Sequence, residues 1–253
     1  AIRTVVVLVF SWWMVFLVGS QAEIARLSGR TLFYLVLSGL STGASWLCYF
    51  RALQLGDVNK VAPIDKSSTV LTILLAFLLL GEPVSAPQIV GVLGIGTGTL
   101  LMISRKETDT EGKPDGRWLL FACLSALFAS LTSIFGKIGV EGVESNLGTA
   151  IRTVVVLGMA WLMVFVTGQQ KGIRRIGRRD WLFLLLSGLS TGLSWLCYYR
   201  ALQDGPASVV VPVDKLSILV TIVFSRLILH EKLSRRAAAG LALLVLGTGA
   251  MLL

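Results

Sequence analysis

The stretch AIRTVVVL at residues 1–8 returns unchanged at residues 150–157, and this repetition decides the fold. The match continues without a gap over residues 1–91 and 150–240, so the two copies are offset by 149 residues. A second identical stretch, SGLSTG, lies within both copies. Self-similarity at a fixed offset indicates a duplicated structural unit. The chain is therefore built from two copies of one unit.

The composition places both copies in a membrane. Of 253 residues, 55% are hydrophobic, and the mean hydropathy is +0.79, which exceeds what the core of a soluble domain hides. Several apolar stretches reach the roughly 20 residues that cross a bilayer as helix, and a helix satisfies its own backbone hydrogen bonds. We therefore predict an all-α, polytopic membrane helix bundle. Nine spans are predicted, at residues 2–20, 31–53, 58–80, 86–104, 118–138, 150–168, 181–202, 207–229 and 236–253.

The second copy predicts the size of the repeated unit. A predicted span at residues 118–138 precedes the repeated motif there, whereas no span precedes Ala1. We expect repeats of five helices, with the first helix absent from this chain. The expected division is a first repeat at residues 1–104, a hydrophilic connector at residues 105–117 and a second repeat at residues 118–253.

Loop charge indicates that the second repeat is inverted. Residues 81–87 contain no Lys or Arg, whereas the equivalent loop contains Lys232, Arg235 and Arg236. An odd number of helices per repeat would turn the second copy upside down, and basic loops face the cytoplasm. We therefore predict two inverted five-helix repeats, with residue 1 inside and the C-terminus outside. The net charge of +9 resides mostly in these loops and does not form a nucleic-acid-binding face.

In the duplicated five-helix unit, a proline-containing helix ends in an apolar run and Gly81-Glu82, or His230-Glu231 in the second copy, and a glycine-rich last helix follows. With these features, the chain resembles EamA-type members of the drug/metabolite transporter superfamily. The resemblance covers essentially the whole chain and implies a membrane transporter. It does not imply a substrate, because the superfamily carries amino acids, nucleotide sugars, phosphorylated sugars and drugs. Ten-helix relatives are described with both termini in the cytoplasm, which differs from the orientation that the loop charges predict.

An Asp-Lys pair follows a proline in each copy, as PIDK at residues 63–66 and PVDK at residues 212–215. Proline opens backbone carbonyls near the middle of a span, and charges within spans tend to mark substrate or ion pathways. Adjacent side chains on a helix point about 100° apart, so each Asp is expected to pair elsewhere than with its neighbouring Lys. The four residues are expected to approach one another around a cavity and to serve substrate binding or coupling, with neutralisation by a neighbouring helix as the structural alternative. They are Asp65, Lys66, Asp214 and Lys215.

Two arginines lie near the N-terminal ends of their predicted helices, where the helix dipole disfavours a cation. These residues, Arg3 and Arg152, therefore predict an anionic partner. The partner is either Asp65 or Asp214 within the bundle, or an anionic group on the substrate. A further alternative is that both arginines point to loop carboxylates, namely Glu141 and Glu144.

In each copy, two aromatic residues lie beside a polar stripe and a Gly-x-x-x-Gly pattern. They are Trp46, Tyr49, Trp195 and Tyr198. Small residues allow close helix packing, but bulky rings beside them more often edge a cavity. We therefore predict that these rings contact the substrate, with interfacial anchoring as the alternative.

The sequence contains no sign of an enzyme. The single histidine is His230, the cysteines have no metal-ligand spacing, and no phosphate-binding loop occurs. We expect no catalytic residue, metal or cofactor. The expected function is a secondary-active or facilitative transporter in a bacterial inner membrane that moves a small anionic or zwitterionic metabolite by alternating access, with a coupling proton or ion as a further partner. The alternatives are a lipid-carrier flippase component, a non-transporting membrane scaffold and an exporter of cationic drugs.

Overall fold

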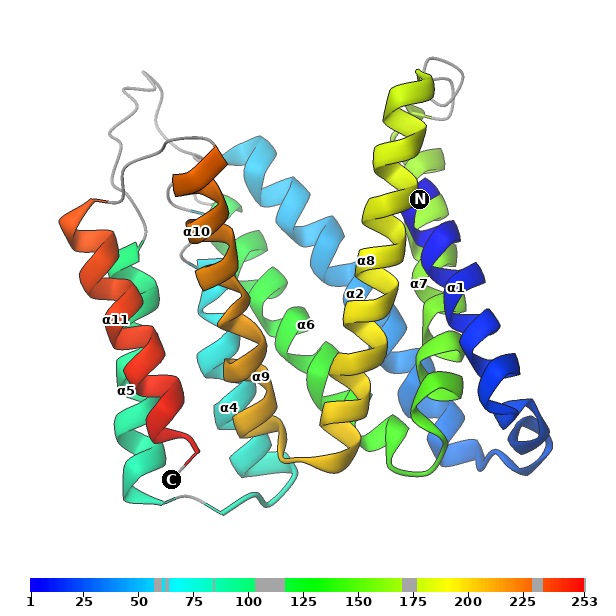
Figure 1. The fold of residues 1–253 in the computed structure, drawn as a ribbon, viewed down its shortest axis with the longest axis horizontal. Helices are drawn as coiled ribbons and strands as arrows, with labels where there is room; N and C mark the ends of the chain where they lie inside the picture. The colour runs from blue at the N-terminus through cyan, green and yellow to red at the C-terminus, as the bar shows by residue number, and fades with distance from the viewer. Residues whose placement is uncertain are drawn as a thin grey trace. The chain divides into compact units, whose positions relative to one another are not determined.

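The computed structural model describes residues 1–56, 61, 64–83, 85–102, 117–169, 177–228 and 234–252. Helices make up nearly all of these residues, and no strand occurs among them, which confirms the predicted all-α class (Figure 1). The elements are α1 (Ile2–Val18), the 3-10 helix η1 (Ser20–Arg26), α2 (Gly29–Leu55), α4 (Ser68–Leu79), α5 (Ala86–Met102), α6 (Arg117–Val140), α7 (Ser145–Val166), α8 (Arg178–Asp204), α9 (Ala207–Lys215), α10 (Ser217–Ile228) and α11 (Arg235–Ala250).

Five helical segments are long and apolar enough to cross a membrane, and each contains at least 18 residues. They are α2, α6, α7, α8 and residues 207–224. A sixth span arises if α1 and η1, which are bent by 95° relative to each other, are counted together. Helix α5 is apolar but shorter. The predicted number of nine spans therefore stays a prediction, although each predicted span contains at least one helix.

The chain divides into two compact units that do not follow the two repeats. Unit 1 contains residues 1–44 and 135–204, and unit 2 contains residues 45–134 and 205–253. Each unit therefore holds helices from both copies of the sequence. The predicted connector at residues 105–117 lies outside the described residues except for Arg117, as do His230, Lys232 and residues 170–176, so the predicted orientation in the membrane stays a prediction.

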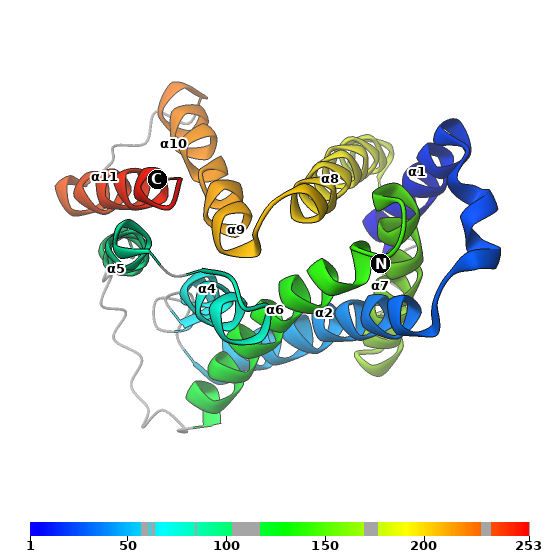
Figure 2. The ribbon, with the colours of Figure 1, turned by 90° about the horizontal axis from the view of Figure 1, so that it is seen from below.

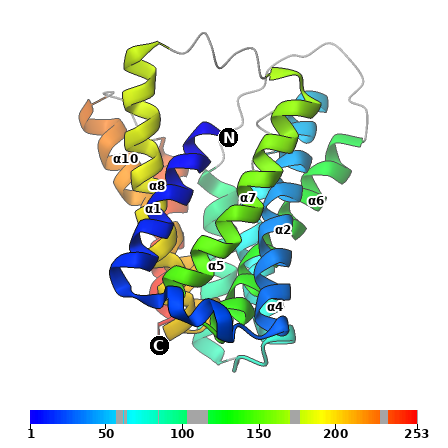
Figure 3. The same cartoon turned by 90° about the vertical axis from the view of Figure 1, so that its right-hand side faces the viewer.

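In unit 1, equivalent helices of the two copies make equivalent contacts. Helix α1 runs antiparallel to α7 and packs against α8, whereas α7 packs against α8 and against α2 (Figures 1 and 3). A Cβ built on Gly39 of α2 would lie 2.7 Å from Val155 of α7, and one built on Gly188 of α8 would lie 2.6 Å from Val6 of α1. The same exchange relates the pairs Gly43–Met159 and Gly192–Phe10. A local pseudo-two-fold axis that reverses helix direction therefore relates the two copies within unit 1.

In unit 2, helices α5 and α11 cross at glycines (Figure 2). A Cβ built on Gly98 would lie 2.5 Å from the carbonyl oxygen of Gly240, and one built on Gly247 would lie 2.8 Å from that of Gly91. The 149-residue offset relates Gly91 to Gly240 and Gly98 to Gly247, so this crossing is also reciprocal. Small residues let two backbones come this close. The antiparallel pair thereby joins the ends of the two copies.

The proline-containing segments are interrupted at the same place in both copies. The amide of Ser67 donates to the carbonyl of Ile64 at 3.1 Å, and the amide of Leu216 donates to that of Val213 at 3.0 Å. Each of these hydrogen bonds joins residues three apart, as in a 3-10 turn, instead of four apart. The turn lies between Lys66 and α4 in the first copy and between Lys215 and α10 in the second. Pro212 lies inside α9 and cannot donate a backbone hydrogen bond to the carbonyl of Ser208, one turn before it. Pro63 itself lies outside the described residues.

Candidate functional site

The guanidinium of Arg152 forms the centre of the candidate site. Arg152 lies on α7 in unit 1, and its side chain is buried, with 2% of the residue exposed. Its Nε donates to Ser38 Oγ at 3.1 Å, and its Nη2 donates to Thr42 Oγ1 at 2.7 Å. Thr42 also donates to the Ser38 carbonyl at 3.0 Å, which fixes the orientation of its hydroxyl. Two neutral hydroxyls on α2 therefore hold one edge of the guanidinium.

Two aromatic rings of α8 cover the same guanidinium. The Cζ atom of Arg152 lies 4.9 Å from the ring centre of Trp195 and 4.6 Å from that of Tyr199. Because the two rings are four residues apart, they share one face of the helix. Both distances fall within the range of cation–π attraction. The rings stabilise the cation without neutralising its charge.

A glycine on α6 gives Tyr199 room to reach the site. A Cβ built on Gly136 would lie 2.6 Å from Tyr199 Cε1 and 3.3 Å from Ser38 Oγ. Tyr199 is almost fully buried, with 2% exposed. Any larger residue at position 136 would therefore displace the ring or the serine.

The charge of Arg152 has no anionic partner among the described residues. Its Nη1 is buried, and no hydrogen bond to it is made by any residue that the structure describes. Burying a cation without an opposite charge is costly. The Nε–Nη2 edge contacts Ser38 and Thr42, so the Nη1–Nη2 edge still points its hydrogens away from α2. That edge matches the paired oxygens of a carboxylate or a phosphate.

The equivalent residue in the first copy, Arg3, is exposed. Within the described residues, no ion pair joins it to Asp65, Asp214, Glu141 or Glu144. The two loop glutamates have other contacts: Glu141 pairs with Lys137 at 3.6 Å, and Glu144 caps α7 by accepting from the amide of Leu147 at 3.1 Å. The carboxylate partners considered for the arginines are therefore not found in the structure.

The predicted carboxylate Asp65 lies in unit 2 and contacts a serine. The hydroxyl of Ser125 on α6 lies 3.1 Å from Asp65 Oδ1 and 3.2 Å from the carbonyl oxygen of Ser45, so it can donate to either. The Ser45 hydroxyl donates in return to the Ser125 carbonyl at 3.1 Å. Ser125 is fully buried, and its presence in an apolar helix was the signal that sequence reasoning overlooked. Lys66, next to Asp65, is exposed.

We expected each Asp to pair with a residue other than its neighbouring Lys, and for the second Asp-Lys pair this expectation is wrong. Lys215 Nζ lies 3.4 Å from Asp214 Oδ2. Helix α9 ends at Lys215, so the ideal angle between neighbours no longer separates the two side chains, and the long lysine stem can turn back. Among the described residues, no ion pair joins Asp214 or Lys215 to Asp65 or Lys66.

The four predicted aromatics separate into the two units. Trp195 contacts Arg152, and Tyr198 packs edge-on against Tyr199 with ring centres 5.2 Å apart. Tyr49 lies in unit 2, where it packs against the core around Ala52 and Ala122. Trp46 also belongs to unit 2 and is half-buried. Tyr199 was not among the predicted site residues, although the neighbouring Tyr198 was.

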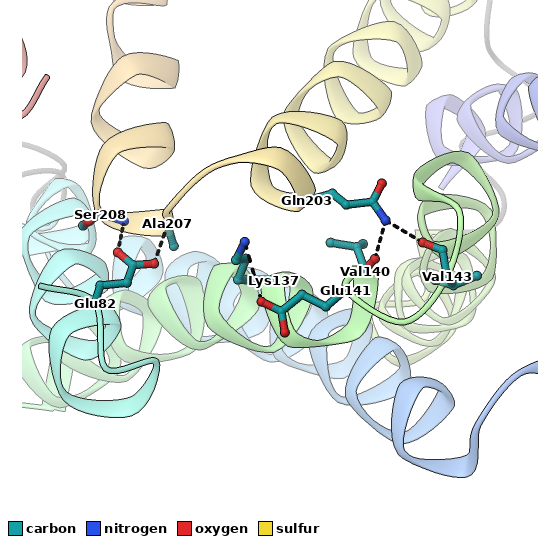
Figure 4. A network of polar contacts seen from close by, with 8 residues as sticks. All are labelled: Glu82, Lys137, Val140, Glu141, Val143, Gln203, Ala207 and Ser208. Carbon is teal, nitrogen blue, oxygen red and sulfur yellow. Dashed lines mark hydrogen bonds and ion pairs between the residues drawn. The ribbon is translucent and has the colours of Figure 1, made fainter.

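Further polar contacts hold helix ends in place, and Figure 4 shows them. In unit 2, the carboxylate of Glu82 accepts from the amides of Ala207 at 2.7 Å and Ser208 at 2.9 Å, at the start of α9. A carboxylate at a helix N-terminus satisfies free amides and complements the dipole. In unit 1, the Gln203 amide donates to the carbonyls of Val140 and Val143, each at 2.7 Å. The Gly81-Glu82 sequence therefore has a structural role as a cap.

The EamA-like transporter family model matches residues 1–104 and 116–253. The chain belongs to this family. An uncharacterized transporter in the cobO 3' region of Sinorhizobium sp. is 48% identical over 130 residues, which are 51% of this chain and 92% of that relative. The uncharacterized transporter YxxF of Bacillus subtilis (strain 168) is 20% identical over 195 residues, 77% of this chain and 60% of that relative.

A crystal structure of a protein with 15% sequence identity supports the same fold. It superposes with a TM-score of 0.67 and covers 99% of this chain and 98% of its own. Together with the family, the relatives and the apolar helices, this identifies an integral, multi-pass membrane transporter rather than an enzyme. The described residues contain no group of three metal-ligating side chains of the His, Cys, Asp and Glu types.

Proposed function

We propose that this EamA-family protein moves a small anionic or zwitterionic metabolite across the bacterial inner membrane by alternating access. Arg152 would bind the anionic group of the substrate. The observation that supports this proposal is a buried guanidinium whose described partners are two hydroxyls and two aromatic rings, with its Nη1 lacking a hydrogen bond.

The proposal follows from the energetic cost of a buried cation. In a low-dielectric site, an uncompensated positive charge is costly, and an anion that enters removes part of that cost. A carboxylate or phosphate can accept two parallel hydrogen bonds from the Nη1–Nη2 edge. Trp195 and Tyr199 would pack against the apolar part of the same ligand. A cationic drug would add to the positive charge, so the site favours an anionic group over such a ligand.

A thermal-shift screen tests the proposal on the purified full chain in detergent. The panel contains amino acids, organic acids, phosphorylated metabolites and quaternary ammonium compounds. A ligand at about 100 times its Kd stabilises the folded state by about 2.7 kcal/mol. We expect an anionic or zwitterionic compound to raise the unfolding temperature of the wild type and to be taken up by proteoliposomes.

Variants of two arginines make the test specific for the site. Arg152→Gln should abolish the shift, and Arg152→Lys should weaken it, because lysine keeps the charge but lacks the planar pair of donors. Arg200→Gln is the control, since Arg200 is exposed and pairs with Asp204 at 2.8 Å. A response limited to quaternary ammonium compounds, or equal binding by wild type and a folded Arg152→Gln protein, would contradict the proposal. A response limited to lipid-linked phosphates would support a flippase component instead.

A further inference from the structure

Asp65 lies at the helix break of the first copy, in unit 2. The amide and the hydroxyl of Ser67 both donate to the Ile64 carbonyl, at 3.1 Å and 2.6 Å, and this turn ends the segment that carries Asp65. The carboxyl group is half-buried and belongs to the predicted span at residues 58–80. Ionisable side chains within a span are costly and tend to mark an ion or proton pathway, and transporters bind coupling ions where a helix is interrupted. Asp65 is therefore a candidate for ion coupling.

No cation pairs with Asp65 among the residues that the structure describes. Lys66 beside it is exposed, and the one described polar partner of Asp65 is the Ser125 hydroxyl. Tyr49 of α2 lies within electrostatic reach of Asp65. The remaining titratable side chains of α2 and α6 in unit 2 are Cys48, Arg51, Arg117 and Cys123. An ionised Asp65 would therefore have no ion-pair partner within the described part of the chain.

The hydrogen bonds around Ser125 have one hydrogen too few if Asp65 is ionised. The Ser125 hydroxyl oxygen lies 3.1 Å from Asp65 Oδ1 and 3.2 Å from the Ser45 carbonyl oxygen, and the Ser45 hydroxyl donates to the Ser125 carbonyl at 3.1 Å. A carboxylate only accepts, so two hydroxyl hydrogens would serve three contacts. A proton on Asp65 Oδ1 supplies the third hydrogen, because Asp65 then donates to Ser125 and Ser125 donates to Ser45. Both serines are buried.

We propose that Asp65 binds the proton that accompanies the substrate, and that Ser125 is its positioning residue. The proton comes from water and forms an O–H bond at Asp65 Oδ1; when that bond breaks, the proton returns to water, and no electron is transferred. Binding removes one negative charge from the helix bundle. The coupling step rests on the proposed function, because one proton bound together with one anionic group makes the movement of that group electroneutral.

The oxygen atoms near Asp65 fit a proton better than a metal ion. Hard metal ions collect about six oxygen ligands. The hydroxyl and carbonyl oxygens of Ser45 and Ser125 instead bond to one another across α2 and α6. A metal ion that used these oxygens would have to break those hydrogen bonds, whereas a proton adds one to them.

Infrared spectroscopy of the full chain in proteoliposomes tests whether Asp65 holds a proton, without any substrate. A neutral carboxylic acid and an ionised carboxylate absorb at different frequencies, and exposed carboxylates are ionised at neutral pH. We expect the wild type at neutral pH to show a neutral-acid band that shifts in deuterium oxide, and we expect Asp65→Asn to lack this band. Asp204→Asn is the matched control, since Asp204 is exposed and pairs with Arg200 at 2.8 Å, and it should keep the band.

Ser125→Ala tests the direction of the hydrogen bond. If Ser125 accepts from the protonated Asp65, its removal should weaken proton binding by about tenfold, which is the effect of losing one hydrogen bond. If Ser125 instead donates to an ionised Asp65, its removal should strengthen proton binding. The measured quantity is the intensity of the neutral-acid band as a function of pH. Ser130→Ala is the matched control, because Ser130 is also fully buried on α6 but donates to the Leu127 carbonyl of its own helix at 2.7 Å.

The coupling step is tested with a compound that the thermal-shift screen identifies. Proteoliposomes that contain a pH-sensitive dye should record proton movement when the wild type takes up the compound. Asp65→Asn should still bind the compound, because Arg152 is unchanged, but should move no protons with it. Equal proton movement by the wild type and Asp65→Asn would contradict the assignment of the proton to Asp65.

The infrared results separate this proposal from the proposed function. The proposal is overturned if the wild type shows no neutral-acid band, if a folded Asp65→Asn protein keeps the band, or if Ser125→Ala binds the proton more tightly. Loss of the band when sodium chloride replaces choline chloride would assign the site to a metal ion and would also overturn it. A missing band would not affect anion binding at Arg152, whereas a band without a response to any anion would contradict the proposed function alone.

Discussion

Arg152 is held by residues that individually have no charge. Its hydrogen bonds reach Ser38 and Thr42, and its cation–π contacts reach Trp195 and Tyr199. Each contact keeps the guanidinium in one orientation while leaving its net charge in place. This arrangement fits the proposed binding and release of an anion, because a permanent carboxylate partner would compete with the ligand.

Gly136→Ala tests how tightly this arrangement is packed. The new methyl group would lie 2.6 Å from Tyr199 Cε1, so we expect the ring to move and stability to fall by about 1–3 kcal/mol. The control is Gly158→Ala on α7, where nothing lies within 4 Å of the added carbon. Alanine there should be neutral or stabilising by up to about 1 kcal/mol, because glycine is a poor helix former. Equal unfolding temperatures for the two variants in detergent would show that Tyr199 is loosely packed.

The sequence singled out Arg152 and Trp195, which lie together in this site. The reason given for Arg152 was wrong, because α7 begins at Ser145 and the arginine lies about two turns beyond the helix start, where the dipole has little effect. The protein carboxylates considered as partners are not found, because hydroxyls on α2 contact the cation instead, and the alternative of an anionic group on the substrate stays a prediction. Tyr199 was missed because a repeat comparison favours Tyr198, which matches Tyr49, whereas the residue at the equivalent of Tyr199 is Phe50.

Helices α5 and α11 show how glycine determines the contact between two elements. Their backbones meet where Gly98 faces Gly240 and Gly91 faces Gly247. The residues Ile73, Ile95 and Met251 form a buried cluster beside this crossing. The hydrophobic effect does not drive helices together within a membrane, because lipid tails are as apolar as the helix side chains. Close van der Waals packing therefore supplies much of the attraction between the helices.

Substituting Gly98 by alanine should separate these two helices. The added carbon would lie 2.5 Å from the carbonyl oxygen of Gly240, an atom of the backbone that cannot rotate away. We expect a loss of about 1–3 kcal/mol, as for other overpacked sites. Gly249→Ala on α11 is the matched control, since nothing lies within 4 Å of its added carbon. The measurement is thermal unfolding of both variants in the same detergent, and a Gly98→Ala protein as stable as the control would contradict the close crossing.

The positions of the helices could be predicted because the length of an apolar stretch and the place of a proline are both read from a short segment of sequence. Each predicted span contains a helix, and Pro212 marked a segment that is in fact two helices. The number of spans was harder to establish, because α1 and α5 have 17 residues each and α11 has 16. Such helices lie at the lower limit of what crosses a bilayer. Their lengths alone therefore do not decide whether each one spans.

For the whole molecule, the sequence repeats and the compact units divide the chain differently. The offset predicts a boundary within residues 105–117, whereas units 1 and 2 each combine segments from both sides of it. A repeat search compares residues in sequence order and contains no information on which helices meet. Contacts such as Gly39–Val155 form between copies, so packing could not be read from the repeat itself.

The predicted inversion can be tested by labelling from one side of the membrane. Gln21 in η1 and Gln169 after α7 are both exposed and follow equivalent helices. If the local axis in unit 1 lies in the membrane plane, Gln21→Cys and Gln169→Cys should react with an impermeant thiol reagent from opposite sides. The experiment uses a cysteine-free background and compares intact spheroplasts with inverted vesicles. Reaction of both cysteines from the same side would contradict inversion.

The reciprocal glycine contacts of α5 and α11 determine how many contacts one mutation changes. In an ancestral protein made of two identical, unfused chains, the α5–α11 crossing would have been isologous, with each contact occurring twice. A single mutation at Gly91 would then have changed two contacts at once. Because both copies lie on one chain here, a mutation at Gly91 leaves Gly240 unchanged, and the same holds for Arg3 and Arg152. The two copies can therefore differ at single positions, as they do where Tyr199 carries a ring hydroxyl and its equivalent Phe50 does not.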